Sequence, residues 1–213
     1  MRLYLIRHGQ SYVNLEEWTN GNTDEGLTEL GHRQAAALAA WLGRALPHVD
    51  ALYASTLRRA RETAAYVAPV YGLPIRFDDR LREIGNCRRD HTPWPNDHLP
   101  RDYVNLWLGE RPFLVATPAV ADGETMMHFR TRVGLFVEGA VDAHRGQTVI
   151  VVTHGGVIEA IFHHVFQTGP WLPCDVWDAN TAITCFELIS DGGMARWRLH
   201  YHNRIDHLRD LDA

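Results

Sequence analysis

Two histidines of this chain stand where apolar segments end. His8 lies in Arg-His-Gly directly after the apolar run Leu3–Ile6, and His154 lies in Thr-His-Gly-Gly directly after Val149–Val152. Each pattern is typical of a strand that delivers an imidazole and then turns sharply at glycine. One such pattern arises readily by chance. Two of them, accompanied by arginines, indicate a site that handles an anion at one edge of a sheet.

Arginines also lie near the ends of predicted strands. Arg7 precedes the first histidine, and Arg58 follows the short strand that ends near Ser55, in the first turn of the next predicted helix. The amide groups of a first helical turn favour anions. A guanidinium group can hold two phosphate oxygens at once, which an ammonium group does less well. We therefore expect Arg58 to bind phosphate, and we expect Arg59 and Arg61, on other faces of the helix, to be solvated charges.

The elements that must position these residues alternate between strand and helix. Alternation predicts an α/β fold, a single three-layer α/β/α domain with a mostly parallel central sheet. Ligands bind such sheets beyond the carboxyl ends of the strands, where Arg7, His8, Ser55 and His154 all fall. Thr28 is the predicted N-cap of the first helix. Strands are expected at 3–6, 50–54, 75–77, 148–152, 181–189 and 195–201, the last two as a C-terminal antiparallel hairpin, and helices at 32–46, from Ser55 or Thr56 to about Tyr71, 123–144 and 156–166.

Composition narrows the classes of function. The 213 residues suit one domain, 1–213, and the net charge of −5 offers no general attraction for nucleic acid. No apolar stretch approaches the roughly 20 residues of a membrane-spanning helix. Arg2 and Arg7 bracket only four apolar residues, so we expect no signal peptide. Three cysteines without Cys-x-x-Cys spacing favour free thiols and a cytoplasmic location.

The thirteen histidines also raise a metal hypothesis. His163 and His164, or His200 with His202, could supply imidazole ligands. No His-Glu-x-x-His pattern occurs, however, and the cysteines are scattered. We therefore expect most of these histidines to be surface or packing residues, and we predict neither a metal site nor a cofactor.

Taken in order, the motifs resemble those of the histidine phosphatase superfamily, the group that includes the cofactor-dependent phosphoglycerate mutases. The resemblance spans nearly the whole chain and is more specific for the family than for a substrate. It rests on Arg7–Ser11 with Asn14, Gly21–Asp24, Leu27–Gly31 with Gln34 and Ala35, the stretch of Ser55, Leu57 and Arg58 with Ala60 and Thr63, Leu81–Gly85, Gly123–Thr125, Thr153–Gly156, and Asn180 with Thr181.

The resemblance implies a catalytic role for each of five residues. His8 would attack phosphorus and carry the phosphoryl group as phosphohistidine. Arg7, Arg58 and a protonated His154 would bind the equatorial oxygens, where charge spreads in the transition state. Glu83 would protonate the leaving alkoxide and then activate water. The alternative for Glu83 is a surface glutamate beside Arg82.

The same resemblance suggests which residues bind substrate. Asn14, Thr23 and Gly155 are expected to contact phosphate or substrate, and a variable substrate lid is expected at about 86–122. After Glu83 many relatives resemble Gly-x-Trp-Glu-Gly, whereas here Asn86, Cys87, Arg88, Arg89 and Asp90 follow Gly85. Arg88 could bind a second anionic group of the substrate, or the arginine pair could be a solvated loop. Specificity is expected from loops around Trp18, Arg88 and Trp107.

We therefore predict a metal-independent phosphomonoesterase that acts on a small soluble phosphate ester. A mutase is the nearest alternative, but such enzymes are usually longer between the glutamate and the second histidine, and here only about seventy residues separate Glu83 from His154. A catalytically silent module that binds a phosphorylated ligand is an alternative of another class. The sequence leaves a monomer and a homodimer equally open.

Overall fold

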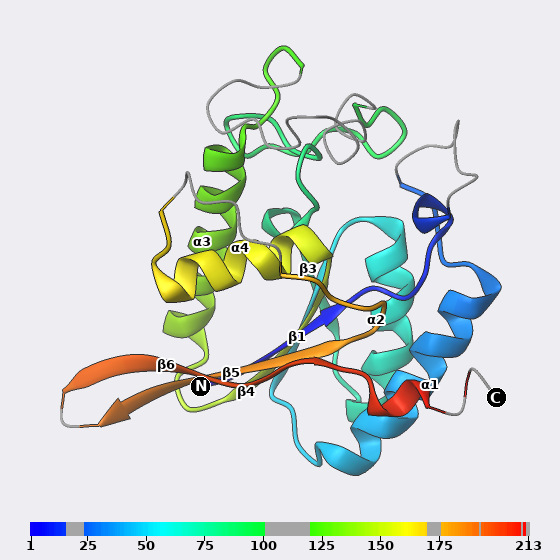
Figure 1. Cartoon of the computed structure of the whole chain (residues 1–213), viewed down its shortest axis with the longest axis vertical. Coiled ribbons are helices and arrows are strands. Elements are labelled where there is room, and N and C mark those ends of the chain that lie inside the picture. The colour runs from blue at the N-terminus through cyan, green and yellow to red at the C-terminus, as the bar shows by residue number, and fades with distance from the viewer. Residues whose placement is uncertain (16–23, 101–119, 170–175, 192, 210, 212–213) are drawn as a thin grey trace.

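A central six-stranded sheet organises the chain. This computed structural model describes residues 1–15, 24–100, 120–169, 176–191, 193–209 and 211. The strand order is β3-β2-β4-β1-β5-β6; β1 to β4 are parallel, β5 is antiparallel to β1, and β6 is antiparallel to β5. The predicted mostly parallel sheet with a closing hairpin is confirmed (Figure 1). The strands are β1 (Arg2–Arg7), β2 (Ala51–Ser55), β3 (Ile75–Asp78), β4 (Thr148–Thr153), β5 (Ile183–Asp191) and β6 (Met194–Arg204).

Helices cover both faces of this sheet, as Figure 1 shows. Helices α1 (Glu29–Ala45) and α2 (Arg58–Tyr71) pack on one face, and α3 (Met126–Ala143) and α4 (Gly155–Phe166) pack on the other. Short 3₁₀ turns, η1 (Tyr12–Asn14), η2 (Asp79–Leu81) and η4 (Asp206–Leu208), lie between or after these elements. The arrangement confirms the predicted α/β/α layers.

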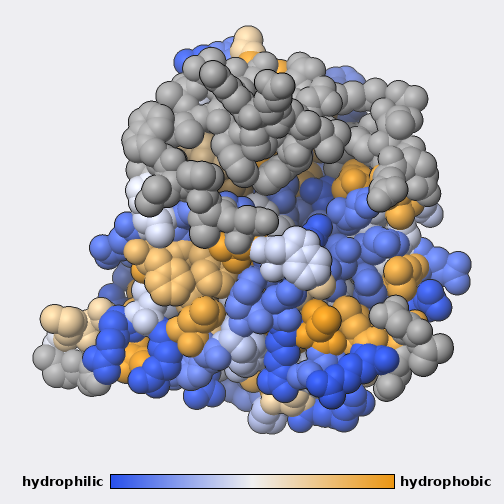
Figure 2. Space-filling view, viewed as in Figure 1, coloured by the Kyte–Doolittle hydropathy of each residue, from blue (hydrophilic) through white to orange (hydrophobic). Residues whose placement is uncertain are grey.

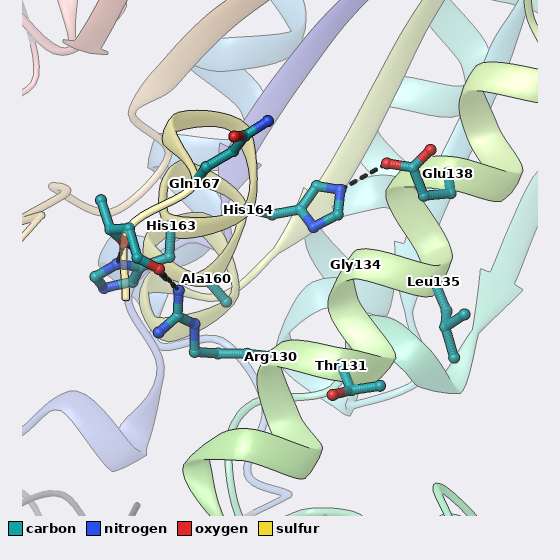
Figure 3. Close-up of a pocket in the computed structure, with 10 residues that line it drawn as sticks. Arg130, Thr131, Gly134, Leu135, Glu138, Ala160, His163, His164 and Gln167 are labelled. Carbon is teal, nitrogen blue, oxygen red and sulfur yellow. Dashed lines mark hydrogen bonds and ion pairs between the residues drawn. The ribbon is translucent and has the colours of Figure 1, made fainter. Parts of the chain in front are cut away.

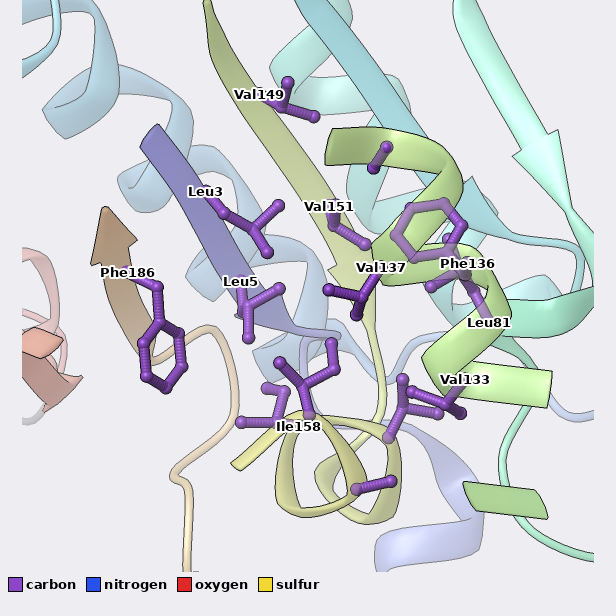
Figure 4. Packing of buried hydrophobic residues seen from close by; sticks show 14 of the residues in the cluster. Leu3, Leu5, Leu81, Val133, Phe136, Val137, Val149, Val151, Ile158 and Phe186 are labelled. Carbon is purple, nitrogen blue, oxygen red and sulfur yellow. The ribbon is translucent and has the colours of Figure 1, made fainter. Parts of the chain in front are cut away.

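Alternating side chains of the central strands fill two cores. Leu3 and Leu5 of β1 belong to the core under α3 and α4, together with Val149 and Val151 of β4 (Figure 4). The intervening residues of the same strands face α1 and α2. A strand buried on both faces is a nearly continuous apolar run, which is why the sequence shows no polar alternation there. Both strands are thereby held firmly up to their carboxyl ends.

The helix starts differ partly from prediction. Thr28 caps α1 as expected, since its Oγ1 accepts the Gly31 N–H at 3.1 Å. The expected cap of α2 by Ser55 or Thr56 is wrong: α2 begins at Arg58, whose N–H donates to Asp24 Oδ1 at 2.6 Å. Both hydroxyls have other partners. Thr56 Oγ1 donates to Asp79 Oδ1 at 2.6 Å, and Ser55 bonds a histidine of the site.

The surface carries no single dominant apolar patch on the face drawn in Figure 2, where hydrophobic residues form separate islands among hydrophilic ones. Exposed large side chains lie on different elements, for example Phe77 on β3, Phe166 on α4 and Met194 on β6. In the described part of the chain, no helix combines the length and apolarity needed to cross a bilayer.

Candidate active site

The register of β1 and β4 brings the two histidines together. Arg7 pairs with Thr153 across the parallel ladder, so His8 and His154 leave the sheet side by side. The His8 N–H donates to the Thr153 carbonyl oxygen at 2.8 Å. The two imidazole rings have centroids 5.1 Å apart and planes inclined at 59°, and both are buried. The expected meeting of two strand ends is therefore present.

His8 is oriented by hydrogen bonds at both ring nitrogens. Nδ1 lies 2.7 Å from the Gly9 carbonyl oxygen, which can only accept, so Nδ1 carries the proton. Nε2 then holds the lone pair, and Arg59 Nε donates to it at 3.1 Å. Burial first, and then the charges of Arg59 and Arg7, hold the pKa of His8 well below 6.5. The ring is therefore neutral near pH 7, with Nε2 available as a nucleophile.

Arg59, not Arg58, is the arginine that α2 brings to the site. The Arg59 side chain is buried, whereas Arg58 is exposed and forms an ion pair with Glu62 at 2.7 Å. Both expectations for this pair are thus corrected: Arg58 is a surface charge, and Arg59 lies against His8. Burial lowers the pKa of Arg59 to about 10. Arg61 is exposed, as expected.

Helical spacing contains the signal that would have identified Arg59. Arg59, Thr63 and Val67 follow one another at four-residue intervals and are all buried. Arg58 and Glu62 share a neighbouring face of α2 that is turned to solvent. Because α2 begins at Arg58, its helical phase places Arg59 on the buried face and Arg58 on the exposed one. The buried apolar residues of α2 mark that face in the sequence.

Arg7 lies at the end of β1 with one nitrogen unused. Its Nη1 donates to the carbonyl oxygen of Asp178. Its buried Nε has no hydrogen-bond partner among the described residues, and it faces Gly155 at the start of α4, where an added Cβ would lie 3.8 Å away. Burial lowers the pKa of Arg7, opposed by the nearby charges of Glu83 and Asp178. Arg7 therefore places a buried cationic N–H donor beside the start of α4.

His154 is the N-cap residue of α4 and is completely buried. Its Nε2 forms a hydrogen bond of 2.8 Å with Ser55 Oγ, and its Nδ1 has no partner in the described part of the chain. Burial, followed by the charge of Arg59, holds the pKa of His154 well below 6.5. The ring is therefore neutral near pH 7 in this structure, in contrast to the protonated ring that the family resemblance implies for the reaction.

Glu83 lies against the positive end of α4. Its Oε2 accepts the Gly156 N–H at 3.2 Å, and its Oε1 accepts the Ile84 N–H at 2.9 Å. A Cβ on Gly156 would lie 2.4 Å from Glu83 Oε1, so a side chain there would displace the Glu83 carboxyl group. The carboxyl group is half-buried, and its charge acts on both Arg7 and Arg59. Glu83 thus belongs to the same cluster and is not a solvated surface residue.

A buried ion pair supports the turn that carries Glu83. Arg132 of α3 and Glu124 are both fully buried and meet at 2.7 Å. Arg132 Nη2 also donates to the Glu83 carbonyl oxygen at 3.0 Å, and Glu124 Oε1 accepts the Gly85 N–H at 2.7 Å. Because Arg132 Nη1 also donates to the Arg80 carbonyl oxygen at 2.8 Å, the pair holds the backbone on both sides of Glu83. Sequence reasoning missed Arg132, since nothing in the sequence of α3 distinguishes it from Arg130 or indicates its partner.

Of the three residues predicted to bind phosphate or substrate, Asn14 and Gly155 lie near His8 or Arg7, and Thr23 is not described. Asn14 Oδ1 accepts from Ser11 N–H at 3.0 Å and from Asn180 Nδ2 at 3.4 Å, and Asn180 Nδ2 also donates to the His8 carbonyl oxygen at 3.1 Å. Asn14 is thereby joined to the His8 loop. Gly155 begins α4 next to Arg7 Nε. Thr23, together with Trp18 and Trp107, lies outside the described residues.

Arg88 is held within its own loop. Its guanidinium group stacks over the Trp94 ring at 4.0 Å and donates to the Pro93 carbonyl oxygen at 2.8 Å. Arg89 is exposed and pairs with Asp122 at 3.1 Å. No recorded contact between described residues joins Arg88 to the histidine cluster. This placement favours a structural role for Arg88 over the predicted substrate contact.

A separate cavity of about 450 Å³ lies between α3 and α4 (Figure 3). It shares no residue with the cluster around His8 and lies toward the carboxyl end of α4. Its polar side chains mainly bond one another: Arg130 donates to the Thr168 carbonyl oxygen at 2.9 Å, and His164 bonds Glu138 at 2.7 Å. The cavity therefore contains none of the groups that converge on His8. Within the described ranges, no group of three or more His, Cys, Asp or Glu side chains is arranged to hold a metal ion.

Comparison with known proteins agrees with this geometry. Residues 3–203 match the family model of the histidine phosphatase superfamily (branch 1). A Hydrogenobacter thermophilus protein named "Putative phosphoserine phosphatase 2" is 34% identical over 215 residues, covering 99% of this chain and 98% of its own. An Escherichia coli protein named "Probable phosphoglycerate mutase" is 29% identical over 176 residues, covering 80% of this chain and 77% of its own.

Solved structures show the same similarity. A mycobacterial glucosyl-3-phosphoglycerate phosphatase, solved with VO3, has 29% sequence identity and a TM-score of 0.70, with 95% of this chain and 98% of that chain covered. Paired strand-end histidines, buried arginines and a carboxyl group at a helix N-terminus occur here in one cluster, and the family model covers nearly the whole sequence. The chain belongs to the histidine phosphatase superfamily.

Proposed function

We propose that this protein is a metal-independent phosphomonoesterase that hydrolyses a small phosphate ester through a phosphohistidine at His8. One observation carries the proposal: buried Arg7 Nε and His154 Nδ1 lack partners in the described structure beside the His8 ring. Buried polar groups without hydrogen bonds are rare in native proteins. A phosphoryl group seated there would supply the missing acceptors.

The charges favour the same ligand. Burial lowers the pKa values of Arg7 and Arg59, because it removes the stabilisation that water gives these cations. A phosphate dianion between them would restore that stabilisation, and it would do so most strongly in the transition state, where charge spreads over the equatorial oxygens. Arg59 takes the role that the sequence suggested for Arg58.

The proposed reaction has two displacements. His8 Nε2 attacks phosphorus, the bond from phosphorus to the ester oxygen breaks, and Glu83 gives a proton to the leaving alkoxide. Glu83 then takes a proton from water, the water oxygen attacks the phosphohistidine, and the N–P bond breaks to release inorganic phosphate. The proton returned to Glu83 restores the starting enzyme.

Ser55 would set the tautomer of His154. Ser55 Oγ already accepts the Leu57 N–H at 3.3 Å, which leaves its hydroxyl proton to donate to His154 Nε2. The His154 proton then lies on Nδ1, the nitrogen without a partner. A neutral imidazole can donate this N–H to a phosphoryl oxygen without carrying a buried charge.

The names of the relatives suggest the first substrates to test. Phosphoserine, phosphoglycerate and glucosyl-3-phosphoglycerate are all small phosphate esters that carry a carboxylate. The lid expected at about 86–122 stays a prediction, because residues 101–119 lie outside the described part of the chain. Net charge of −5 argues against nucleic acid as a partner, and the buried free thiols of Cys87 and Cys185 fit the proposed cytoplasmic location.

The test is hydrolysis of a generic aryl phosphate in excess chelator by the wild type, by His8→Ala and by His48→Ala. His48 is the matched control, because its side chain is 76% exposed. Turnover that resists the chelator, persists in His48→Ala and vanishes in His8→Ala, together with an acid-labile phosphoenzyme, would support the proposal. Turnover that survives in His8→Ala would exclude His8 as the nucleophile.

The mutase alternative has support from the Escherichia coli relative's name. A mutase returns the phosphoryl group to product, whereas a phosphatase transfers it to water. Phosphoenzyme labelled from phosphoglycerate and then diluted into buffer distinguishes the two. Rapid release of inorganic phosphate supports the phosphatase, and a stable phosphoenzyme discharged only by phosphoglycerate supports the mutase.

A further inference from the structure

Asp178 is a buried carboxylate whose charge acts on Arg7. Its side chain is 0% exposed, and its backbone carbonyl oxygen accepts from Arg7 Nη1. Neither carboxylate oxygen has a hydrogen-bond partner within the described structure. Thr184 lies close enough to affect the carboxyl group, but the Thr184 hydroxyl forms its 2.9 Å hydrogen bond with His202. The reaction proposed above makes no use of this carboxyl group.

His202 of β6 faces the same carboxyl group. Its Nε2 lies 3.1 Å from the Trp177 carbonyl oxygen and must donate to it, which leaves a lone pair on Nδ1. That Nδ1 is 3.5 Å from Asp178 Oδ1. The Thr184 hydroxyl donates to that lone pair at 2.9 Å, so the neutral ring offers no proton to the buried carboxylate, and one proton added to either member removes or pairs its charge. The pair then has no net charge, whichever member carries the proton.

We propose that Asp178 and His202 hold one proton between them, and that its loss places a negative charge near Arg7 and weakens the binding of phosphate by Arg7. Both are positioning residues, since they act through Arg7. The inference rests on the proposed function, in which Arg7 binds the phosphoryl group.

Few groups around Asp178 could stabilise its ionised carboxylate. Arg7 on β1 is the cation that acts on Asp178, and Glu83 lies near Arg7 as well. Thr184 on β5 and His202 on β6 are the polar groups at the carboxyl, and α4 contributes the apolar ring of Phe162, 5.0 Å from the His202 ring. Burial raises the pKa of Asp178 to about 7 and lowers that of His202, so the proton resides on Asp178 and leaves near neutral pH.

The direction of the pH effect follows. Below the Asp178 pKa the carboxyl group is neutral, and the full charge of Arg7 acts on the ligand. Above it the carboxylate shares that charge, so anion affinity falls as pH rises. Asp178→Asn keeps the shape and removes the titration, so its affinity stays at the low-pH value of the wild type.

Sulfate is the probe, because it is a tetrahedral dianion whose charge does not change near neutral pH. Its dissociation constant is measured by calorimetry from about pH 6 to about pH 8, either side of the Asp178 pKa of about 7. Asp142→Asn is the matched control, since its side chain is 76% exposed. We expect affinity to fall about tenfold in the wild type and in the control, and to stay constant in Asp178→Asn. Asp178→Ala, also uncharged, replaces Asn if that variant fails to fold.

Catalysis supplies a second readout. The ratio of kcat/KM for Asp178→Asn to that of the wild type should rise with pH, because titration of the substrate cancels in the ratio. An active wild type whose pH profile matches that of Asp178→Asn overturns this inference and leaves the proposed function standing. A wild type that binds sulfate with the expected pH dependence but hydrolyses no ester contradicts the proposed function alone. Absence of sulfate binding at every pH contradicts both.

Discussion

Arg59 Nε donates a hydrogen bond of 3.1 Å to His8 Nε2, across 51 residues of sequence. The bond joins the first turn of α2 to the loop after β1. It fixes the lone pair of His8 beside a buried guanidinium group, so the proposed nucleophile and the cation that would receive its phosphoryl oxygens are already in place. The neighbouring Arg58 has no such relationship to the site.

Arg59→Ala should reduce kcat/KM for aryl phosphate hydrolysis by about 10²- to 10³-fold, as loss of a transition-state donor does. Arg58→Ala is the matched control and should stay within a few-fold of wild type, because its exposed ion pair with Glu62 contributes little. Steady-state kinetics of both variants check the assignment. A larger loss in Arg58→Ala than in Arg59→Ala would restore the original sequence-based assignment.

Glu83→Gln should slow esters with poor leaving groups more than esters with good ones. Glutamine keeps the hydrogen bond from Gly156 but cannot protonate an alkoxide. The measurement is kcat/KM over a series of aryl and alkyl phosphates. Equal losses across the series would remove Glu83 from the acid role.

Gly156→Ala should displace the Glu83 carboxyl group and so reduce activity, since the new Cβ would lie 2.4 Å from Glu83 Oε1. Gly155→Ala is its neighbour and control: the new Cβ would meet the Arg7 guanidinium group at ordinary distances, 3.8 Å from Nε and 4.0 Å from Cζ. We expect a loss of about tenfold or more in kcat for Gly156→Ala, by misplacement of the acid, and a smaller change for Gly155→Ala. Similar activity of the two variants would show that the contact has no effect on the reaction.

Glu124→Gln should lower the free energy of unfolding by about 3 kcal/mol, because it leaves Arg132 charged and buried without its counterion. The turn that carries Glu83 should loosen as well, with a fall in kcat. Glu138→Gln, at an exposed side chain on α3, should change stability by about 0.5 kcal/mol or less. Urea unfolding of both variants measures the difference; a small effect in Glu124→Gln would mean that the buried pair adds little to stability.

Acid should destabilise the fold through His8 and His154. Burial keeps their folded pKa values well below 6.5, so below that pH the unfolded chain binds protons that the folded chain does not. Their stabilising contribution is therefore complete above pH 6.5 and is lost as pH falls, by up to about 1.4 kcal/mol per pH unit for each ring. His8→Asn should reduce this slope, and His48→Asn, at an exposed ring, should not. Unfolding midpoints over a series of acidic buffers compare the slopes; equal slopes in wild type and His8→Asn would contradict the burial argument.

The local sequence is sufficient to predict several strands, the loops that follow them and one helix cap. Apolar runs that end in histidine and glycine determine β1, β4 and the loops after them, because strand propensity and glycine turns depend on neighbouring residues. Alternation of strands and helices determines the layered fold, and parallel pairing then places His8 beside His154. Thr28 shows that even a helix cap can be read in this way.

The tertiary structure decided what depends on distant partners. The packing of α2 on the sheet decided that Arg59 is buried and that Arg58 is exposed. Neither the ion pair of Arg132 with Glu124 nor the neutral state of His154 can be read from neighbouring residues, since both depend on burial among groups remote in the sequence. Asp178 contacts Arg7 because the segment before β5 lies next to the end of β1, which pairs with β5. Electrostatics and desolvation act through space, so they become definite only once the fold is complete.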